Sequence, residues 1–273
     1  MRLDETAPLT TSSRGGPQVS VVIPARNEAE NIGLVLRALP EIVDEVIVVD
    51  GHSSDETCDV VRARRPDAVV LSQTGRGKGD ALRTGFAAAR GEFVVMLDAD
   101  GSMNPAEIRR IVRLLEDGFE FVKGSRFMTG GGTSDITGAR RVGATALLRL
   151  ANVLYGTHHT DLLYGYCGFR RDSLQRLCLS ADGFEIETEI VVRAARYGLM
   201  TAEVPSFEAE RLAGKSHLHA VRDGFRVLRT LLRERFAPPL ADRDEAGLAP
   251  VLIALPEVVP SDAKSEAAGI RAR

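Results

Sequence analysis

Short runs of apolar, mostly β-branched residues alternate with helical patterns over residues 19–126, and this alternation constrains the fold more than any other feature of the sequence. Each run is nearly continuous in Val, Ile, Leu or Phe and is bounded by turn residues, as expected for strands that are covered on both faces. The predicted strands are 19–24, 45–50, 68–72, 92–98 and 119–124. The alternation predicts an α/β fold with a mostly parallel sheet and helices on both faces.

Helix signals fill the gaps between the runs and continue beyond them. The helix expected after the fourth run has Asn104 as its cap, Pro105 at its first position and Glu107 to complete a capping box. Gly118 can end this helix. Helical spacing predicts further helices at 140–154, 186–197 and 222–236.

The last of these helices carries two adjacent stripes. The apolar stripe consists of Val221, Phe225, Leu228 and Leu232, and the basic stripe consists of Arg222, Arg226, Arg229 and Arg233. A basic amphipathic helix is typical of peripheral membrane contact, but a helix packed on its own domain with a solvated charged face has the same pattern. We favour the packed helix and keep the membrane contact as the alternative.

Length and composition are those of one large soluble domain. The 273 residues are 44% hydrophobic and 27% charged, and a formal net charge of −3 gives no general attraction to nucleic acid. The sequence has no apolar leader, and no run of about 18 apolar residues predicts a membrane span. Three separated cysteines suggest no disulfide framework, so we expect a cytoplasmic protein, with the inner face of the membrane as an open alternative. We predict one domain over 19–236, a loose tail over 1–18 and a mostly disordered tail over 237–273.

Carboxylates at the ends of predicted strands are the strongest functional signal. Asp98 and Asp100 close the fourth run with one residue between them, and Asp50 ends the second run. Ligands of open parallel sheets bind outside the carboxyl ends of the strands. Two carboxylates one residue apart can hold Mg²⁺ or Mn²⁺ together with substrate phosphates, although a solvated turn has the same sequence. Asp50 can accept hydrogen bonds from a base or a ribose, or it can cap the entry of the next helix.

Two loops add polar and basic groups at the same edge. The segment 24–28 brings Arg26 and Glu28 to where a nucleotide can lie, although Glu28 can also cap the following helix. The segment 75–79, Gly-Arg-Gly-Lys-Gly, combines Lys78 with glycines that let backbone N–H groups approach an anion. It matches neither the Walker P-loop nor the dinucleotide fingerprint. The segment therefore indicates a basic loop near phosphate.

Together and in this order, these features resemble family 2 inverting glycosyltransferases of the GT-A fold. The resemblance is greatest to the branch of dolichol- and polyprenyl-phosphate mannosyl- and glucosyltransferases, and it covers about 19–236. The matching segments are 21–28, 48–53, 77–81, 98–100, 124–127, 168–170 and 211–216. An Asp-X-Asp triplet alone is common, but the ordered set is specific.

The resemblance implies a hexosyltransferase that needs Mg²⁺ or Mn²⁺. Its donor would be a nucleotide-diphosphate sugar of the GDP-mannose or UDP-glucose type, and its acceptor a polyprenyl phosphate or another small molecule. The residues implied to bind the nucleotide sugar are Pro24, Ala25, Arg26, Glu28, Asp50, Lys78, Asp98 and Ser216. Asp100 is implied to bind the metal, and Arg126 and Arg211 to stabilise phosphate charge.

Two departures from the family pattern concern the metal and the membrane. Gly101 and Ser102 follow the Asp-X-Asp triplet where the phosphomannosyl branch usually has Leu-Gln, so a side-chain amide ligand is missing. His219 can replace that ligand through a neutral imidazole, or it can simply lie at a helix start. The C-terminal transmembrane helices that some relatives carry are also not seen in this sequence.

An acidic segment after a Gly-Phe pair is the expected acceptor side. Glu185, Glu187 and Glu189 recur at every second position, and Glu185 matches the acidic position of relatives, which makes it our candidate catalytic residue. The same acids can cap the next helix. Asp161 is expected to position Arg170 or the acceptor. An acceptor phosphate is already ionised at pH 7, whereas an acceptor hydroxyl would need a carboxylate as its base.

Three other functions stay open at this point. One is a glycosyltransferase with a soluble hydroxyl acceptor. A sugar-1-phosphate nucleotidyltransferase has a related core, but it usually opens with a Gly-rich loop where 24–27 reads Pro-Ala-Arg-Asn. A non-catalytic nucleotide-sugar-binding module would not need the Asp-X-Asp triplet. The sequence specifies neither the base, nor the sugar, nor the oligomeric state.

Overall fold

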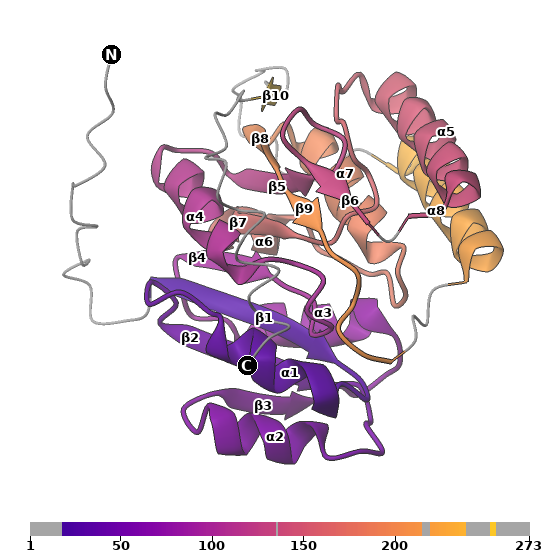
Figure 1. The fold of residues 1–273 in the computed structure, drawn as a ribbon. Helices are drawn as coiled ribbons and strands as arrows, with labels where there is room; N and C mark the ends of the chain where they lie inside the picture. Colours follow the sequence, from indigo (N-terminus) through magenta and orange to yellow (C-terminus); the bar gives the residue numbers. More distant parts are fainter. Residues whose placement is uncertain (1–17, 135, 215–218, 239–251, 255–273) are drawn as a thin grey trace.

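One mixed sheet organises the computed structural model, which describes residues 18–134, 136–214, 219–238 and 252–254 (Figure 1). The strands are β1 (Val19–Ala25), β2 (Glu45–Asp50), β3 (Val69–Ser72), β4 (Phe93–Met96), β5 (Phe121–Ser125), β6 (Gly132–Thr133), β7 (Cys167–Arg170), β8 (Thr201–Pro205), β9 (Phe207–Glu208) and β10 (Leu252–Ala254). The helices are α1 (Ala29–Arg37), α2 (Thr57–Arg64), α3 (Lys78–Ala88), the 3₁₀ turn η1 (Pro105–Glu107), α4 (Ile108–Glu116), α5 (Gly138–Tyr155), α6 (Arg171–Arg176), α7 (Ile186–Tyr197) and α8 (Ala220–Phe236).

The main sheet has the strand order β10-β8-β5-β7-β4-β1-β2-β3. All neighbouring strands are parallel except β7, which runs antiparallel to both β4 and β5. Strands β6 and β9 form a separate two-stranded parallel ribbon. The five predicted strands are confirmed as β1 to β5. The strands β1, β2, β4 and β5 are largely buried, as their composition indicated, whereas β3 lies at the sheet edge and is only partly buried.

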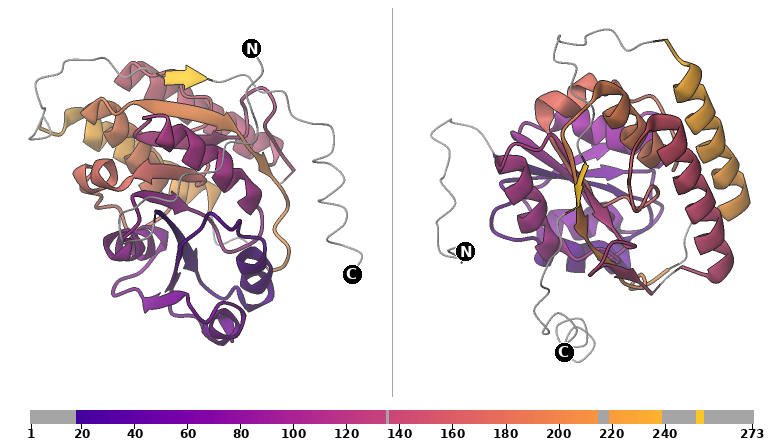
Figure 2. Two further views of the ribbon diagram at one scale, coloured as in Figure 1. Left: turned by 90° about the vertical axis from the view of Figure 1, so that its left-hand side faces the viewer. Right: turned by 90° about the horizontal axis from the view of Figure 1, so that it is seen from above.

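Two apolar layers cover the sheet. Helices α1, α2 and α4 pack on one face with side chains such as Ile32, Val61 and Ile111. Helices α3, α5, α6, α7 and α8 cover the other face, with side chains such as Leu82 and Ile190 in that layer. Figure 2 shows the helices on either side of the sheet, as predicted for a doubly covered α/β fold.

The predicted helix ends agree closely with the structure. The side chain of Asn104 accepts a hydrogen bond from the backbone N–H of Ala106, so it caps the turn that leads into α4. Helix α5 begins at Gly138 and α8 at Ala220, each two residues earlier than predicted. Helix α7 spans Ile186–Tyr197, the same residues as the prediction.

The predicted tails fall largely outside the described residues, so their boundaries stay a prediction. Within the predicted C-terminal tail, Leu252–Ala254 form β10 and pair with β8. Among the helices that the structure describes, none has both the length and the apolar character needed to cross a bilayer.

Candidate active site

The strand ends that carry the predicted acids meet at one edge of the sheet. Strand β1 lies between β2 and β4 and is parallel to both, with Ala25 opposite Asp50 and Val22 opposite Met96. Asp50 and the Asp98–Asp100 turn therefore flank the end of β1. The separation of β2 from β4 is two strand spacings, about 10 Å. This edge is the carboxyl edge at which ligands of open α/β sheets bind.

The loops after β1 and β2 are joined into one surface. Asn27 accepts a hydrogen bond from the backbone N–H of Ser54 through its side-chain oxygen at 2.8 Å, and its own N–H donates to Ser53 Oγ at 2.9 Å. Asp50 accepts from the N–H of Ser53 at 3.2 Å and so caps the turn after β2, but it does not cap the entry of α2, whose N-cap is Glu56. Arg26 is exposed beside this surface. The loops leave backbone and side-chain groups of 24–28 at the sheet edge.

Lys78 is held between two carboxylates beside the Asp-X-Asp triplet. Its Nζ lies 2.7 Å from Asp98 Oδ1 and 2.7 Å from Glu187 Oε1. Gly165 makes room for this contact, because a Cβ there would lie 2.6 Å from Glu187 Oε1. Burial alone would lower the pKa of Lys78, but the two carboxylates outweigh it and raise the pKa. Lys78 is therefore a permanent cation at the edge of the site.

The carboxylates outnumber the cation here. Burial raises the pKa of Asp98, Lys78 opposes that rise, and the neighbouring charge of Asp100 adds to it. Burial likewise raises the pKa of Glu187, with the charge of Asp98 adding to the rise. Asp98 and Glu187 thus share one ammonium group, and Asp100 adds a third negative charge beside Asp98. This excess of negative charge favours a bound divalent cation.

The segment after β9 lies across the Asp-X-Asp turn. Leu212 N–H donates to the backbone oxygen of Asp100 at 3.1 Å, and Ala209 N–H donates to that of Ser102 at 2.9 Å. Gly101 has φ +77°, and a Cβ there would meet Leu212 Cδ1 at 2.5 Å. The departure from Leu-Gln at this turn therefore has a structural reason, because only glycine fits beneath Leu212 in that backbone conformation.

Arg211 ties the same segment to the end of β1. Its Nη2 donates to Glu28 Oε1 at 2.6 Å and its Nε donates to the backbone oxygen of Ala213 at 2.8 Å. Asn31 completes the contact by donating to Glu28 Oε2 and to the oxygen of Ala213. Glu28 occupies the N-cap position of α1 without capping it through its side chain, which pairs with Arg211 instead. Its contact with the nucleotide sugar stays a prediction. We call residues 209–214 the strap.

Arg126, which follows β5, is clamped by two acids. Its Nε and Nη2 donate to Asp161 at 2.7 and 3.0 Å, and its Nη1 donates to Glu208 at 3.0 Å. The guanidinium also lies 4.9 Å from the ring centre of Tyr164. The expectation that Asp161 positions Arg170 is wrong, because Arg170 pairs with Glu92 at the far end of β7.

The backbone at the end of the Gly-rich loop, residues 75–79, is hydrogen-bonded to Asp182. Gly77 has φ +97° and leads into α3, and the N–H groups of Gly79 and Asp80 both donate to the backbone oxygen of Asp182. These N–H groups are the ones that a phosphate at the start of α3 would need. The loop therefore contributes Lys78 to the site through its side chain, and not an open backbone cradle.

The three acids of the predicted acceptor segment have different surroundings. Glu185 Oε1 accepts from Gly183 N–H, while its buried Oε2 has no hydrogen-bond partner among the described residues. Glu187 forms an ion pair with Lys78. Glu189 accepts from the backbone of Ser180 and Ala181 and from Arg233, so it holds the chain before α7 in place. Glu185 is the acid that keeps a free acceptor atom.

The donor atoms of the described residues show how far the predicted metal-binding residues could hold an ion. The described residues contain no group of three or more His, Cys, Asp or Glu side chains that could hold an ion. Asp100 keeps a carboxylate oxygen that no described residue contacts, since its Oδ1 accepts from Ser102 N–H. One carboxylate fits Mg²⁺ or Mn²⁺ only if phosphates of the donor and water complete the coordination shell, which is how Mg²⁺ is commonly held.

His219 lies at the N-cap of α8 and its backbone N–H donates to Asp223, so its role as a ligand stays a prediction. Ser216 lies outside the described residues.

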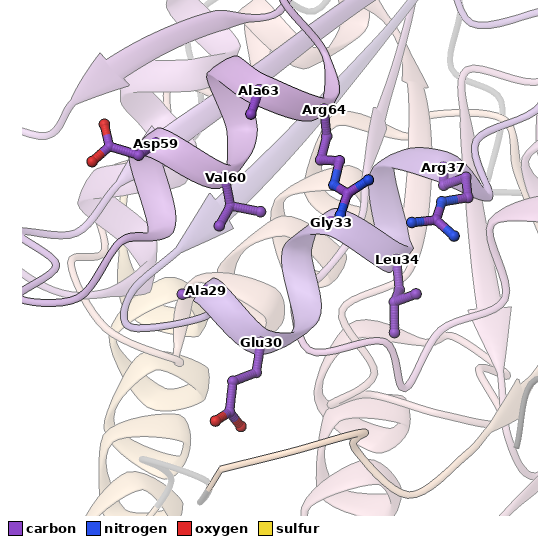
Figure 3. Close-up of a pocket in the computed structure, with 9 residues that line it drawn as sticks. All are labelled: Ala29, Glu30, Gly33, Leu34, Arg37, Asp59, Val60, Ala63 and Arg64. Carbon is purple, nitrogen blue, oxygen red and sulfur yellow. The ribbon is translucent and has the colours of Figure 1, made fainter. Parts of the chain in front are cut away.

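A second hollow in the surface lies apart from the predicted site residues. It lies between α1 and α2, has a volume of about 620 Å³ and is lined by charged and apolar side chains including Glu30, Arg37 and Asp59 (Figure 3). None of the predicted site residues lines it. The candidate site is therefore the sheet edge with its strap.

Comparison with known proteins identifies the family of the chain and several relatives. Residues 20–178 match the family described as Glycosyl transferase family 2. The chain belongs to this family. It is 34% identical over 220 residues to glycosyltransferase AglJ of Haloferax volcanii, covering 79% of this chain and 71% of AglJ. It is 32% identical over 213 residues to the undecaprenyl-phosphate mannosyltransferase of Micrococcus luteus, covering 74% and 87%, and 32% identical to the polyprenol monophosphomannose synthase of Mycolicibacterium smegmatis, covering 72% and 80%.

Solved structures show the same fold. Glucosyl-3-phosphoglycerate synthase of Mycobacterium tuberculosis, in complex with Mn²⁺, UDP-glucose and phosphoglyceric acid, has a TM-score of 0.63 and 26% identity, with 82% of this chain and 81% of that chain covered. The predicted GT-A fold and the prediction of a hexosyltransferase are confirmed. The match argues against a nucleotidyltransferase.

Two of the acids that hold the site's cations, Glu187 and Glu208, are not predicted in that role from the sequence. Glu187 was considered only as one of three acids, and Glu208 was not singled out. Their partners lie far away in sequence, Lys78 by 109 residues and Arg126 by 82 residues. The period-two repeat of acids at the start of α7 was the available signal for Glu187.

Proposed function

We propose that this chain transfers a hexose from a nucleotide-diphosphate sugar to a polyprenyl phosphate, with Mg²⁺ or Mn²⁺ at the Asp98–Asp100 turn. The observation that carries the proposal is the arrangement of carboxylates at the sheet edge, where Asp98 shares Lys78 with Glu187 and the strap crosses the backbone of Asp100. Two relatives named for undecaprenyl-phosphate and polyprenol-phosphate mannose transfer support the acceptor. The structural neighbour with Mn²⁺ and UDP-glucose supports the donor and the metal.

The nucleotide would lie along the joined loops after β1 and β2. Pro24, Ala25 and Arg26 would line the base and ribose, and Asp50 would accept from the base while it caps its own turn. Lys78 and Asp98 would face the sugar side. Ser216 would contact phosphate from the chain that follows the strap.

Breaking the anomeric bond leaves negative charge on the departing diphosphate. A metal ion held by Asp100, with His219 as its second candidate ligand, supplies neutralising charge there when bound. Arg211 adds a cation from the strap, and Arg126 adds one from the end of β5. Both are ordered by carboxylate partners before any ligand arrives, which lowers the reorganisation needed in the reaction.

The acceptor would attack from the side of Glu185, opposite the leaving group, and so invert the anomeric centre. A phosphate monoester with a second pKa of about 6 is ionised at neutral pH and needs no base. Glu185 would then position the acceptor. The acceptor's lipid character implies peripheral contact with the inner face of a membrane.

A soluble hydroxyl acceptor is the second candidate. The neighbour bound to phosphoglyceric acid favours it, as does the unpaired Oε2 of Glu185, since a hydroxyl would need a carboxylate to take its proton.

An assay of radiolabelled hexose transfer distinguishes a polyprenyl phosphate acceptor from a soluble hydroxyl acceptor. Purified protein is incubated with labelled GDP-mannose or UDP-glucose and Mn²⁺, and offered either a short-chain polyprenyl phosphate or phosphoglycerate. We expect label in the polyprenyl phosphate. Label only in phosphoglycerate would establish the second candidate, and label in neither, with donor binding intact, would contradict both.

A further inference from the structure

Helix α8 presents its apolar stripe to solvent. The exposed fractions along the stripe are Val221 76%, Phe225 69%, Leu232 42% and Phe236 81%. Together with Leu228 and two arginines, most of this stripe lines a shallow groove of about 450 Å³. Single exposed apolar residues are ordinary, but a continuous row along a helix marks an interaction site. The stripe expected from the sequence is therefore real, but it is not the face that packs on the domain.

The opposite side of α8 is fixed by polar anchors. Glu234 accepts from Arg193 and Arg196 of α7 at 2.9 and 2.6 Å, and Tyr155 of α5 donates to the backbone oxygen of Leu231 at 2.6 Å. Val227 and Leu231 are buried on this side. These contacts hold the helix so that the apolar stripe points away from the core. Figure 1 shows α8 beside α5 at the outer edge of the molecule, and the views of Figure 2 agree.

The charge on the outward side of α8 is entirely positive. The helix has two acids, Asp223 and Glu234, and both are buried on the packed side. At 3.6 residues per turn, Arg229 and Arg235 fall on the two flanks of the apolar stripe. Both are exposed, and neither forms an ion pair with a residue that the structure describes. An apolar row flanked by arginines complements an anionic lipid surface.

The same helix borders the acceptor side of the site. A Cβ placed on Gly183 would lie 2.4 Å from Glu185 Oε2 and 3.0 Å from Arg226 Nη1, so α8 and the acidic segment meet there. Helix α8 also begins only a few residues after the strap. A surface seated on α8 would therefore adjoin the place where the acceptor enters.

We propose that the face of α8 formed by Val221, Phe225, Leu228, Leu232 and Phe236, with Arg229 and Arg235 at its flanks, docks on an anionic lipid bilayer. The helix would lie in the headgroup plane with its aromatic side chains inserted. The proposal rests on the proposed function, because a polyprenyl phosphate acceptor is delivered from such a surface. A second copy of the chain is an alternative occupant, but a two-fold interface would bring the same arginines close to one another.

Cosedimentation with vesicles tests the docking. The full chain is mixed with vesicles of phosphatidylcholine alone, or of phosphatidylcholine with phosphatidylglycerol. The variants are F225S/F236S for the apolar stripe and R229E/R235E for its flanks. The matched controls are L34S on α1 and R37E/R62E on α1 and α2, all at exposed positions away from α8.

We expect the unchanged chain and both controls to bind the anionic vesicles, and each α8 variant to bind at least about tenfold more weakly. Equal binding by the unchanged chain and the α8 variants would overturn the proposal. It would also be overturned if the chain ignored the vesicles and formed a dimer in ultracentrifugation that F225S/F236S dissociates.

A parallel assay keeps the docking and the proposed function apart. Transfer to a short-chain polyprenyl phosphate in solution needs no bilayer, and the α8 variants should retain it, which also shows that they are folded. Loss of vesicle binding with transfer intact is the result expected for those variants. If the unchanged chain binds vesicles but transfers to no polyprenyl phosphate, the proposed function fails while the docking stands.

Discussion

Arg211 and Glu28 are 183 residues apart in sequence, yet Nη2 of the arginine lies 2.6 Å from Oε1 of the carboxylate. The pair closes the strap over the end of β1, next to the turn that carries Asp100. Both side chains are largely buried, so the pair holds the strap more firmly than a surface ion pair would.

Glu28→Gln should weaken donor binding more than it slows turnover. The change leaves Arg211 without its anionic partner and loosens the strap, so we expect the KM for the donor to rise about tenfold with a smaller change in kcat. Arg211→Met should lower kcat/KM by about 10²-fold, because it also removes a cation from the leaving group. Steady-state kinetics measures both, and Glu30→Gln on the exposed side of α1 is the matched control. If the two changes act through the strap, the double variant will resemble Arg211→Met alone, and additive effects would contradict the pairing.

Lys78→Met should destabilise the fold strongly. It leaves Asp98 and Glu187 facing each other without a cation, and removing one partner of a buried ion pair typically costs about 3–5 kcal/mol. The loss should be smaller at lower pH. Burial raises the pKa of both carboxyls, so they take up protons as the pH falls from neutral and the repulsion disappears.

Urea unfolding at pH 7 and at pH 5 measures this effect. Arg76→Met, at an exposed cation two positions earlier in the same loop, is the control and should change little. An equal loss from Lys78→Met at both pH values would show that the carboxylates are not the source of the destabilisation.

The Arg126–Asp161 pair should stabilise the protein in a manner that depends on pH. Burial alone would raise the pKa of Asp161, but the hydrogen bonds and charge of Arg126 outweigh it and hold the pKa below the ordinary value of 3.8. A carboxyl whose pKa is depressed on folding contributes stability that is complete above its unfolded pKa and is lost as the pH falls through the folded pKa.

Asp161→Asn should therefore lower the free energy of unfolding by about 3 kcal/mol at pH 7, since it leaves a buried guanidinium with one fewer carboxylate. The difference from the unchanged protein should shrink below about pH 4. A denaturation series over pH measures the difference, and a gap that stays constant down to pH 3 would refute the assignment. Asp117→Asn, on the surface after α4, serves as the control.

The strands of the first half were predictable because each contains a short apolar run, and all but the edge strand β3 are largely buried. The strands β7 and β8 were not. Strand β7, Cys-Gly-Phe-Arg, is four residues long and inserts antiparallel between β4 and β5. Strand β8 buries Glu203, which accepts hydrogen bonds from Thr160, and ends in a proline. A carboxylate within a short segment interrupts the apolar run that predicts a strand, so the sequence pattern indicates a loop there.

The location of the site could be predicted from the sequence, but the pairing of its charged side chains could not. The rule for parallel sheets brings Asp50, Asp98 and Asp100 to one edge. Which carboxylate holds which cation depends on contacts across 20 to 183 residues of chain, and spacing does not encode these. Helix α8 is a similar case, because periodicity reveals its apolar stripe, whereas the inward turn of Glu234 depends on Arg193 and Arg196 of another helix.

Glu185→Gln should distinguish the two acceptor classes by its magnitude. A phosphate acceptor needs no base, so the variant should keep kcat within about tenfold and raise mainly the KM for the acceptor. A hydroxyl acceptor would lose about 10²–10⁴-fold in kcat, because general base catalysis is worth that much. Initial rates over acceptor concentration and pH measure the split. Asp182→Asn, an exposed acid three positions earlier, is the control.

The Asp98–Asp100 turn should couple donor binding to the metal. Asp100 has a carboxylate oxygen available at the sheet edge, but the described residues provide too few ligands for an ion on their own. We therefore expect the donor and the ion to bind together. In a thermal-shift panel, GDP-mannose or UDP-glucose should raise Tm with Mn²⁺ present and much less after EDTA treatment, because a ligand specific to the native state stabilises it by mass action.

Asp100→Ala should abolish both the Mn²⁺-dependent shift and transfer, while its Tm without ligand stays near that of the unchanged protein. Asp59→Asn, an exposed acid on α2, should behave as the unchanged protein does. The base of the nucleotide that gives the larger shift identifies the donor. Full transfer by Asp100→Ala, or a donor shift that EDTA leaves untouched, would remove the metal from this turn and leave Lys78, Arg126 and Arg211 as the groups that must neutralise the leaving diphosphate.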